Sequence, residues 1–284
     1  MASTRDIRRR IKSVGNTQKI TRAMEMVSAA KMRKSVASVL AIRPYAHAAW
    51  SVLTNLSRAF EENQTGLLEV REVKRVLAIS ITSNKGLCGA FNAQISKKIR
   101  DEISNPEKLK INRIGNKKIE SDEKDIKIDF ITIGKKGENV VRKAGKDIIA
   151  SFNNLAYLPN IDDVRTVGKI IMDDYLAKKY DKVVIFYTDY VSAMSQHPKV
   201  RQLLPISKID LEKQIAEMDV LAKEYGLKEP KREYKIEPSP KVVLGHILPR
   251  LIEMQIFHAI LESNASKESA RMMAMRNATD AAGE

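Results

Sequence analysis

Few side chains of this chain could carry out covalent chemistry. Cys88 is the single cysteine, and a thiolate nucleophile needs a base such as histidine beside it. The four histidines are His47, His197, His246 and His258, and none has the spacing of a metal-binding motif such as HExxH. His258 falls on an apolar helical pattern, which is typical of a packed core histidine. These residues predict a protein that binds or moves, with no catalytic residue, metal or cofactor of its own.

Two glycine-bearing turns could hold a phosphate. Residues 83–92 follow a predicted strand and precede a predicted helix, which is where dinucleotide-binding domains hold phosphate on a helix N-terminus. The spacing of Gly86 and Gly89 matches neither GxGxxG nor GxxxxGK[ST], and residues 134–137 also lack a third glycine. We interpret both turns as structural or contact loops. An α/β enzyme that uses residues 83–92 to bind phosphate stays open as an alternative.

The positive charge is concentrated in the first sixty residues. The chain has 284 residues and a net charge of +15, from 50 basic and 35 acidic side chains. Residues 1–60 contain twelve Lys and Arg against Asp6 and Glu25, a net charge of +10, whereas residues 241–284 are balanced. Such a concentration of positive charge implies an acidic partner, which could be nucleic acid, anionic lipid or an acidic protein surface. No aromatic residue precedes Tyr45 to stack on bases, so a solvated or protein-facing helix face is favoured.

The composition is that of an ordinary soluble chain. Hydrophobic residues make up 43% and aromatic residues 5%, a balance that favours long helices over a β-sandwich. No run approaches the roughly 20 apolar residues of a membrane span, and the basic N-terminus lacks the apolar core of a secretion signal. A single cysteine excludes an internal disulfide and indicates a reducing compartment. We expect a soluble protein, or one peripheral to a larger body.

Both ends of the chain carry a heptad stripe, along residues 7–60 and along residues 244–282. A shared period of 3.5 residues predicts two helices wound around each other, on the order of 80 Å and 60 Å long. The pairing residues expected from the stripes are Ile7, Ile11 and Val14 in the first helix, and Leu251, Met254, Leu261, Met272 and Met275 in the second. Polar residues fill the centre of the first stripe, which lowers stability while fixing register. A second apolar track there, Ile20, Met24, Val27 and Ala30, predicts more than one neighbour.

The middle of the chain alternates strand and helix patterns. Strands are expected at 75–82, 127–133 and 182–188, with an extended segment at 199–206 that could return antiparallel, and helices at 93–103, 137–143, 164–179 and 208–225. The polar segment 105–127 is expected to be an exposed loop. The predicted fold class is therefore α/β: a long antiparallel two-helix coiled coil with an inserted Rossmann-like domain. Its expected divisions are residues 1–66 for the first helix, 67–228 for the α/β domain, 229–240 for a linker and 241–284 for the second helix.

The chain ends carry specific motifs. Residues 7–34, IRRRIKSVGNTQKITRAMEMVSAAKMRK, and residues 268–284, ESARMMAMRNATDAAGE, closely resemble the terminal signatures of the gamma subunit of F-type ATP synthase. Residues 83–92, SNKGLCGAFN, resemble a characteristic loop of that family. The resemblance implies a noncatalytic central rotor shaft, one copy per complex, inside a ring of alpha and beta subunits. It also implies contacts with epsilon and the c-subunit ring, and none with nucleic acid.

The resemblance assigns contacts to matching positions. Residues 19–34, with Met24, Lys31 and Arg33, resemble the region beside the acidic lever segment of beta, and Lys85, Gly86 and Cys88 resemble a second patch near that lever. Residues 271–280, beginning at Arg271, resemble the paired face of the C-terminal helix. Proton flow would turn the shaft, and the implied location is the cytoplasmic face of a bacterial plasma membrane.

The chain departs from the family pattern at its end, because family members usually continue for several helical turns past the AGE motif, whereas this sequence stops at Glu284. We therefore expect that the C-terminal tip is missing. The cysteine-bearing insertion of chloroplast members is also absent, which favours a bacterial origin.

The main alternative to a rotor shaft is a basic coiled-coil scaffold that binds nucleic acid or anionic membrane.

Overall fold

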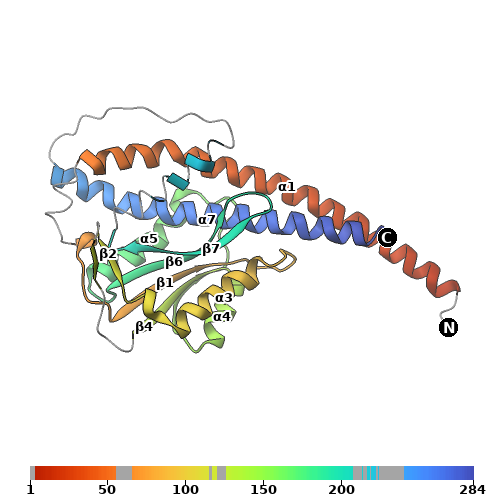
Figure 1. Cartoon of the computed structure of the whole chain (residues 1–284), viewed down its shortest axis with the longest axis horizontal. Coiled ribbons are helices and arrows are strands. Elements are labelled where there is room, and N and C mark those ends of the chain that lie inside the picture. The colour runs from red at the N-terminus through yellow and green to blue at the C-terminus, as the bar shows by residue number, and fades with distance from the viewer. Residues whose placement is uncertain are drawn as a thin grey trace.

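The computed structural model describes residues 4–55, 66–114, 117–119, 126–206 and 240–284, together with 213, 216, 217, 219–221 and 223. Two long helices, α1 (Thr4–Asn55) and α7 (Pro240–Ala281), run antiparallel side by side and form a rod. An α/β domain lies along the opposite side of α7 from α1 (Figure 1). The predicted architecture of a rod with an inserted α/β domain is confirmed.

A five-stranded sheet forms the centre of the α/β domain. In spatial order its strands are β5 (Ile148–Phe152), β4 (Lys127–Ile133), β1 (Arg75–Ile81), β6 (Lys182–Tyr190) and β7 (Gln196–Leu204). The first four are parallel and β7 pairs antiparallel with β6. Parallel strands are usually covered on both faces, and β1 accordingly is buried at every position after Arg75.

Helices cover both faces of this sheet. On one face, α3 (Phe91–Ser104) and α4 (Lys135–Lys143) pack through Ile95, Ile99 and Val141 against alternate residues of the strands. On the other face, α5 (Ile161–Leu176) and α7 pack on the intervening residues, such as Leu77 and Ile185. Because α7 belongs to both the sheet core and the rod, the two parts of the molecule share one hydrophobic core.

The sequence pattern located most elements correctly. The three predicted parallel strands and the antiparallel return at 199–206 correspond to β1, β4, β6 and β7. Strand β5 was not predicted, and the expected loop at 105–127 contains the turn η2 (Pro106–Lys108) and a short hairpin of β2 (Asn112–Ile114) and β3 (Lys117–Ile119). A further turn, η1 (Gly66–Leu68), precedes β1. The predicted helix 208–225 and the linker 229–240 lie largely outside the described residues.

The heptad register of the rod is confirmed from residue 18 onward. The polar seam positions Thr21, Ser28 and Ser35 are buried in α1. In α7, Leu251, Met254, Leu261 and Met275 are buried, while Met272 and Arg271 are half-buried. The Oγ1 atoms of Thr21 and Thr279 are hydrogen-bonded at 2.7 Å across the seam. Thr279 thus provides a polar partner for Thr21 and, through its carbonyl oxygen, for Gln18 across the seam.

The predicted pairing positions in the first turns of α1 have no partner from α7 within this chain. Ile7, Ile11 and Val14 are 48%, 66% and 45% exposed. Helix α7 ends at Ala281, and the residues that follow lie next to Gln18, so no residue of α7 lies opposite these three positions. In Figure 1 the first turns of α1 continue alone past the end of α7.

Among the described helices, none is long and apolar enough to cross a membrane.

Candidate partner-contact surface

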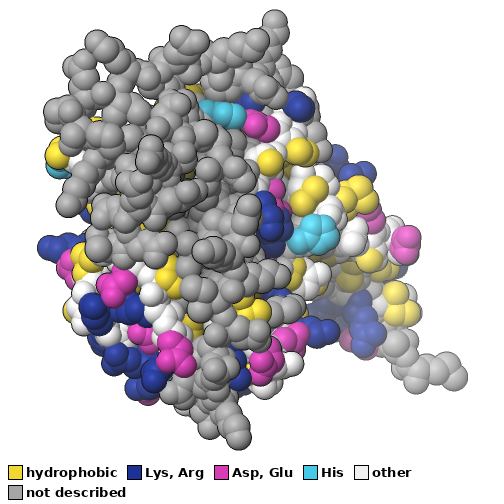
Figure 2. Space-filling view, turned by 60° about the vertical axis from the view of Figure 1, so that its left-hand side comes forward, with side chains coloured by type: hydrophobic (Ala, Val, Ile, Leu, Met, Phe, Trp, Pro, Cys, Tyr) yellow, Lys and Arg dark blue, Asp and Glu magenta, His cyan; other side chains and the backbone are white. Residues whose placement is uncertain are grey.

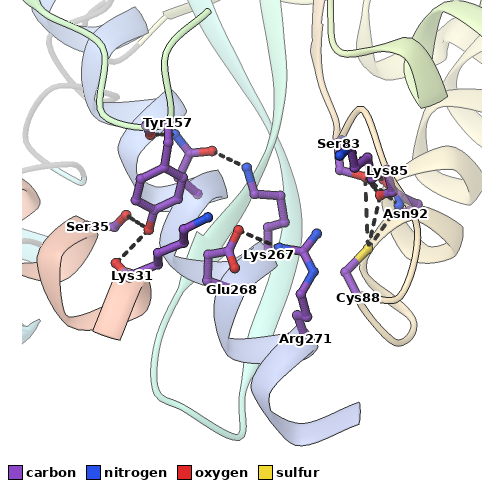
Figure 3. A network of polar contacts seen from close by, with 11 residues as sticks. Lys31, Ser35, Ser83, Lys85, Cys88, Asn92, Tyr157, Lys267, Glu268 and Arg271 are labelled. Atoms are coloured by element: carbon purple, nitrogen blue, oxygen red, sulfur yellow. Dashed lines mark hydrogen bonds and ion pairs between the residues drawn. The ribbon is translucent and has the colours of Figure 1, made fainter. Parts of the chain in front are cut away.

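The loop 83–92 has a closed network of side-chain hydrogen bonds. The hydroxyl of Ser83 donates to the carbonyl oxygen of Lys85 at 2.5 Å, and the amide nitrogen Nδ2 of Asn92 donates to Sγ of Cys88 at 3.0 Å (Figure 3). Cys88 is only 2% exposed, whereas Leu87, with a φ of 60°, is 65% exposed. The predicted contact through the Cys88 side chain is therefore corrected: Lys85, Gly86 and Leu87 form the outer surface of this loop, and Cys88 supports it from inside.

The same loop contacts both α4 and α7. On the α4 side, the backbone N–H groups of Lys135, Lys136 and Gly137 donate to Asn84 Oδ1, the Ser83 carbonyl and Thr82 Oγ1, at 3.0, 3.1 and 2.7 Å. These are the amides that a phosphate would need at this helix N-terminus. Since residues 82–84 already bind them, residues 134–137 form a structural turn, as expected from their spacing.

Gly89 fits closely against α7. Its φ is +52°, and a Cβ added there would lie 3.4 Å from the carbonyl oxygen of Ala270 and 3.9 Å from Cβ of Ala274. A glycine accommodates this left-handed conformation and the close approach of the helix backbone. The loop is therefore held directly against the turn of α7 that contains Arg271.

Tyr157 connects the loop before α5 to both rod helices. Its hydroxyl donates to the carbonyl oxygen of Lys31 at 2.5 Å and accepts from Ser35 Oγ at 2.6 Å, and its carbonyl accepts from Asn264 Nδ2 at 2.8 Å (Figure 3). The ammonium of Lys31 lies 5.1 Å from the centre of its ring. Burial raises the pKa of Tyr157 to about 12, so the phenol stays protonated. Sequence reasoning missed this residue, because a single tyrosine in an irregular segment carries no periodic signal.

Helix α1 presents an exposed basic face. Ten of its basic side chains are exposed: Arg5, Arg8, Arg9, Arg10, Lys12, Lys19, Arg22, Lys31, Arg33 and Lys34. Figure 2 shows dark-blue basic side chains interspersed with yellow apolar ones along the part of the rod that recedes to the right. Ile20 and Val27 of the second apolar track are 60% and 54% exposed, and Met24 is half-buried. The predicted contact residues of α1 thus lie on a surface that is basic and partly apolar.

Two of the predicted partner-contact residues, Lys31 and Lys85, line one cavity. Arg271, predicted for pairing within the rod, lines it as well, and its Nη1 lies 2.5 Å from Oε1 of Glu268. Met24 and Arg33 do not line it. The structure therefore brings the loop 83–92 next to one turn of α1 and one turn of α7, and leaves the remaining α1 contacts further along the rod.

His258 and His47 each lie next to a carboxylate, and His197 lies 3.0 Å from the hydroxyl of Ser195. His258 is buried, with Nε2 at 3.5 Å from Oε1 of Glu262, and burial lowers the pKa of His258 to about 3. Burial also raises the pKa of Glu262, so both groups are neutral near pH 7 and pack as core residues. His47 contacts Asp219 at 2.7 Å. Among the described residues, no group of three or more His, Cys, Asp or Glu side chains could hold a metal ion.

Comparisons with known proteins agree on one class of molecule. The fold resembles the central stalk of the Tetrahymena thermophila mitochondrial ATP synthase, with a TM-score of 0.60, 22% identity, and coverage of 91% of this chain and 99% of that one. It also resembles the rotor of the Euglena gracilis mitochondrial enzyme, with a TM-score of 0.59, 17% identity, and coverage of 97% and 90%. A rod of two terminal helices with an inserted α/β domain is thus the fold of ATP synthase central stalks.

The sequence comparisons define the family. A family model described as ATP synthase matches residues 3–284. The ATP synthase gamma chain of Dehalococcoides mccartyi (strain CBDB1) is 37% identical over 286 residues, and that of Legionella pneumophila (strain Corby) is 34% identical over 284 residues. Each alignment covers all of this chain and 89% of the relative. The chain belongs to the ATP synthase gamma chain family.

Proposed function

We propose that this chain is the central rotor shaft of a proton-driven ATP synthase and has no catalytic site of its own. The observation that carries the proposal is a rod of two long helices fused through one core to an α/β domain, in a chain that matches the gamma chain family from end to end. ATP would be made or hydrolysed on the surrounding beta subunits. Rotation of the rod would force those sites through successive conformations.

The shared core suits the transmission of torque. Helix α7 packs against α1 on one side and against β6 and α5 on the other. In this proposal the α/β domain and the adjacent end of the rod bind epsilon and the c-subunit ring, and the rest of the rod stands inside the ring of alpha and beta subunits. A twist applied to the domain then passes directly into α7. The location proposed is the cytoplasmic face of a bacterial plasma membrane, with one copy per complex.

The proposed contacts with the beta lever segment are individually weak, and all except the half-buried Met24 are exposed. They are Met24, Lys31 and Arg33 of α1, and Lys85 and Gly86 of the loop 83–92, with Leu87 beside them. Exposed ion pairs are worth about 0–1 kcal/mol each, so each can break at every step of rotation. A preference of several kcal/mol for one angle would instead hold the rotor in one state. A basic, half-apolar surface without deep anchors fits this requirement.

Reconstitution tests the proposed function. Adding this chain to purified alpha and beta subunits of the same organism should produce a stoichiometric complex with cooperative ATP hydrolysis. The scaffold alternative predicts tight binding to DNA or to anionic vesicles and no incorporation into an alpha and beta complex, and that result would exclude the rotor role.

A substitution at Met24 tests the contact assignment. Met24→Lys adds a charge at a half-buried sliding contact and should lower the number of protons pumped per ATP hydrolysed, while the complex still assembles. The matched control is Met194→Lys, which makes the same change at a side chain that is 82% exposed in the turn between β6 and β7. Unchanged coupling in Met24→Lys, or an equal loss in the control, would contradict the assignment.

A further inference from the structure

A cavity of about 350 Å³ lies where the rod meets the carboxyl ends of the parallel strands. Its floor includes the last residues of three strands, Ile81, Ile133 and Phe152. Its other walls are the loop 83–92, residues 153–157 and one side of α7. In open α/β sheets, this edge is where ligands bind. The cavity belongs to the isolated chain, so a ligand there does not depend on the proposed rotor role.

Basic side chains from three separate segments converge on this cavity. Lys31 comes from α1, Lys85 from the loop 83–92, and Lys267 and Arg271 from α7 (Figure 3). Among the described residues that line it, the only carboxylate is that of Glu268, which is already paired with Arg271. Within the described part of the chain, none of the three lysines forms an ion pair with a carboxylate. The three lysines therefore give the cavity positive charge that no described carboxylate pairs with.

Lys267 and Arg271 are half-buried, whereas Lys31 and Lys85 are exposed. The ammonium of Lys267 donates to Asn264 Oδ1 at 2.6 Å and lies 5.5 Å from the centre of the Tyr157 ring. Burial lowers the pKa of Lys267 to about 8, and the neighbouring charges of Arg271 and Lys31 act in the same direction. Glu268 opposes this shift without cancelling it. A bound anion would stabilise the ammonium form here far more than at an exposed lysine.

We propose that this cavity binds an oxyanion of the phosphate class between Lys31, Lys267 and Arg271. The donors around the space suit such an anion, because guanidinium and ammonium groups form charge-assisted hydrogen bonds to phosphate oxygens. A nucleoside base has no open aromatic face to stack on: Phe152 packs against the sheet core, and the Tyr157 ring has a lysine ammonium at 5.1 Å and another at 5.5 Å. The recognised group is therefore phosphate itself, free or at the end of a nucleotide.

An anion in this position would connect three parts of the molecule. It would contact the rod through Lys31 and Arg271 and the loop 83–92 through Lys85, which is near the end of β1. A ligand that binds only the folded chain stabilises it in proportion to its concentration. Phosphate should thus raise the thermal stability of the chain and strengthen the junction between the rod and the α/β domain.

Calorimetric titration of the full chain with sodium phosphate, at constant ionic strength in chloride, tests the proposal. The expected result is saturable binding of one phosphate per chain and a higher melting temperature. Lys267→Gln should weaken binding at least about tenfold, and Lys31→Gln should also weaken it. The matched control is Lys169→Gln, which removes the same charge from an exposed position on α5 and should bind like the wild type.

Two results would overturn the proposal: no saturable binding beyond that of chloride, or an equal loss of affinity in Lys169→Gln. Parallel titration with ATP distinguishes the source of the anion. Binding of phosphate alone supports a free-anion site. Binding of ATP as well, lost in Lys267→Gln, supports recognition of phosphate on a nucleotide.

A measurement on the wild-type chain keeps the proposal testable if a variant does not fold. Sulfate stays a dianion between pH 6 and 10, so its affinity should fall as the pH rises through and beyond about 8, where Lys267 loses its proton. The titratable and charged groups around Lys267 are Lys31 from α1, Lys85 and Cys88 from the loop 83–92, Tyr157, and Glu268 and Arg271 from α7. A sulfate affinity that is constant over this range would contradict a site built on Lys267.

Discussion

Two segments of the rod share one heptad pattern but differ in what stabilises them. The docked segment consists of α1 residues 35–49 and α7 residues 251–269, and the free segment consists of α1 residues 18–32 and α7 residues 272–282. In the docked segment every α7 residue except Phe257 and Lys267 is buried. In the free segment only Thr21, Ser28 and Met275 are buried. The stability of each segment therefore depends on contacts with residues outside the rod and not on the heptad period.

The neighbours of the docked segment belong to the α/β domain. Ser263 and Ser266 of α7 bond the backbone of Thr188 in β6, at 3.1 and 3.2 Å. On the α5 side, a Cβ added at Gly168 would lie 3.2 Å from the side chain of Glu253, which shows how closely the two helices pack. The free segment has fewer contacts outside the seam: Tyr157 and Tyr190 bond Lys31 and Met32 at one end of it, and Gly89 lies near Ala274. We therefore expect the docked segment to resist deformation and the free segment to deform under load.

Truncating an apolar side chain of the docked segment should give the largest loss. Leu251→Ala removes a side chain that is 1% exposed in the shared core, and such truncations lower the free energy of unfolding by about 2–5 kcal/mol. Urea unfolding followed by circular dichroism measures the loss. Val14→Ala, at a 45% exposed position of the same rod, is the control. Equal losses in the two variants would show that the rod is not anchored through this core.

Acid should weaken the contribution of His258 to the docked segment, while the raised pKa of the neighbouring Glu262 acts in the opposite direction, because the folded chain binds that carboxyl proton first. The folded-state pKa of His258, about 3, is below its unfolded value near 6.5, so the unfolded chain binds the proton first and stability falls as the pH drops below 6.5. From pH 7 to 5.5 this linkage lowers the free energy of unfolding by about 1 kcal/mol. His258→Gln, which cannot titrate, should lose that much less over the same interval. If the free energy of unfolding depended on pH equally in the two proteins, His258 could not be a buried histidine that stays neutral in the folded chain.

Removing a polar contact in the free segment should have a smaller effect. Thr21→Val deletes the hydroxyl that bonds Thr279, and a net hydrogen bond contributes about 0.5–1.5 kcal/mol. The loss should be near the lower end, because Thr279 still donates to the carbonyl oxygen of Met275 at 2.8 Å. Thr17→Val, at an exposed position, is the control. A double-mutant cycle of Thr21→Val with Thr279→Val that showed no coupling would contradict a role for this pair.

The smallest effect is expected in the first turns of α1. Ile11→Ser changes a side chain that is 66% exposed, and surface substitutions of this kind usually change the free energy of unfolding by less than about 0.5 kcal/mol. The measurement is the same urea unfolding of the isolated chain. A loss comparable to that of Leu251→Ala would mean that this face packs against part of the same molecule.

The sequence predicted the elements better than their neighbours. Alternating or continuous apolar runs located β1, β4 and β6, because buried parallel strands require them. Strand β5 was missed because it lies at the edge of the sheet, where half-buried and exposed residues alternate and none is fully buried. Such a strand has no continuous apolar run in the sequence. The heptad period identified the face of α1 that carries Ile7 and Ile11, but a period does not state how far the partner helix extends. Tyr157 and Leu87 lie in irregular segments. The positions of such segments follow only from tertiary contacts, so the sequence did not predict the role of either residue.

The glycine at the foot of the loop 83–92 has a consequence for motion. Gly89 rests on the backbone of α7, while residues 82–84 hold the first amides of α4. The loop therefore connects α4 of the α/β domain to α7 of the rod. Because Gly89 packs on the backbone of α7 at Ala270, we expect a displacement of α7 at this turn to move the exposed residues Lys85 and Leu87 as well.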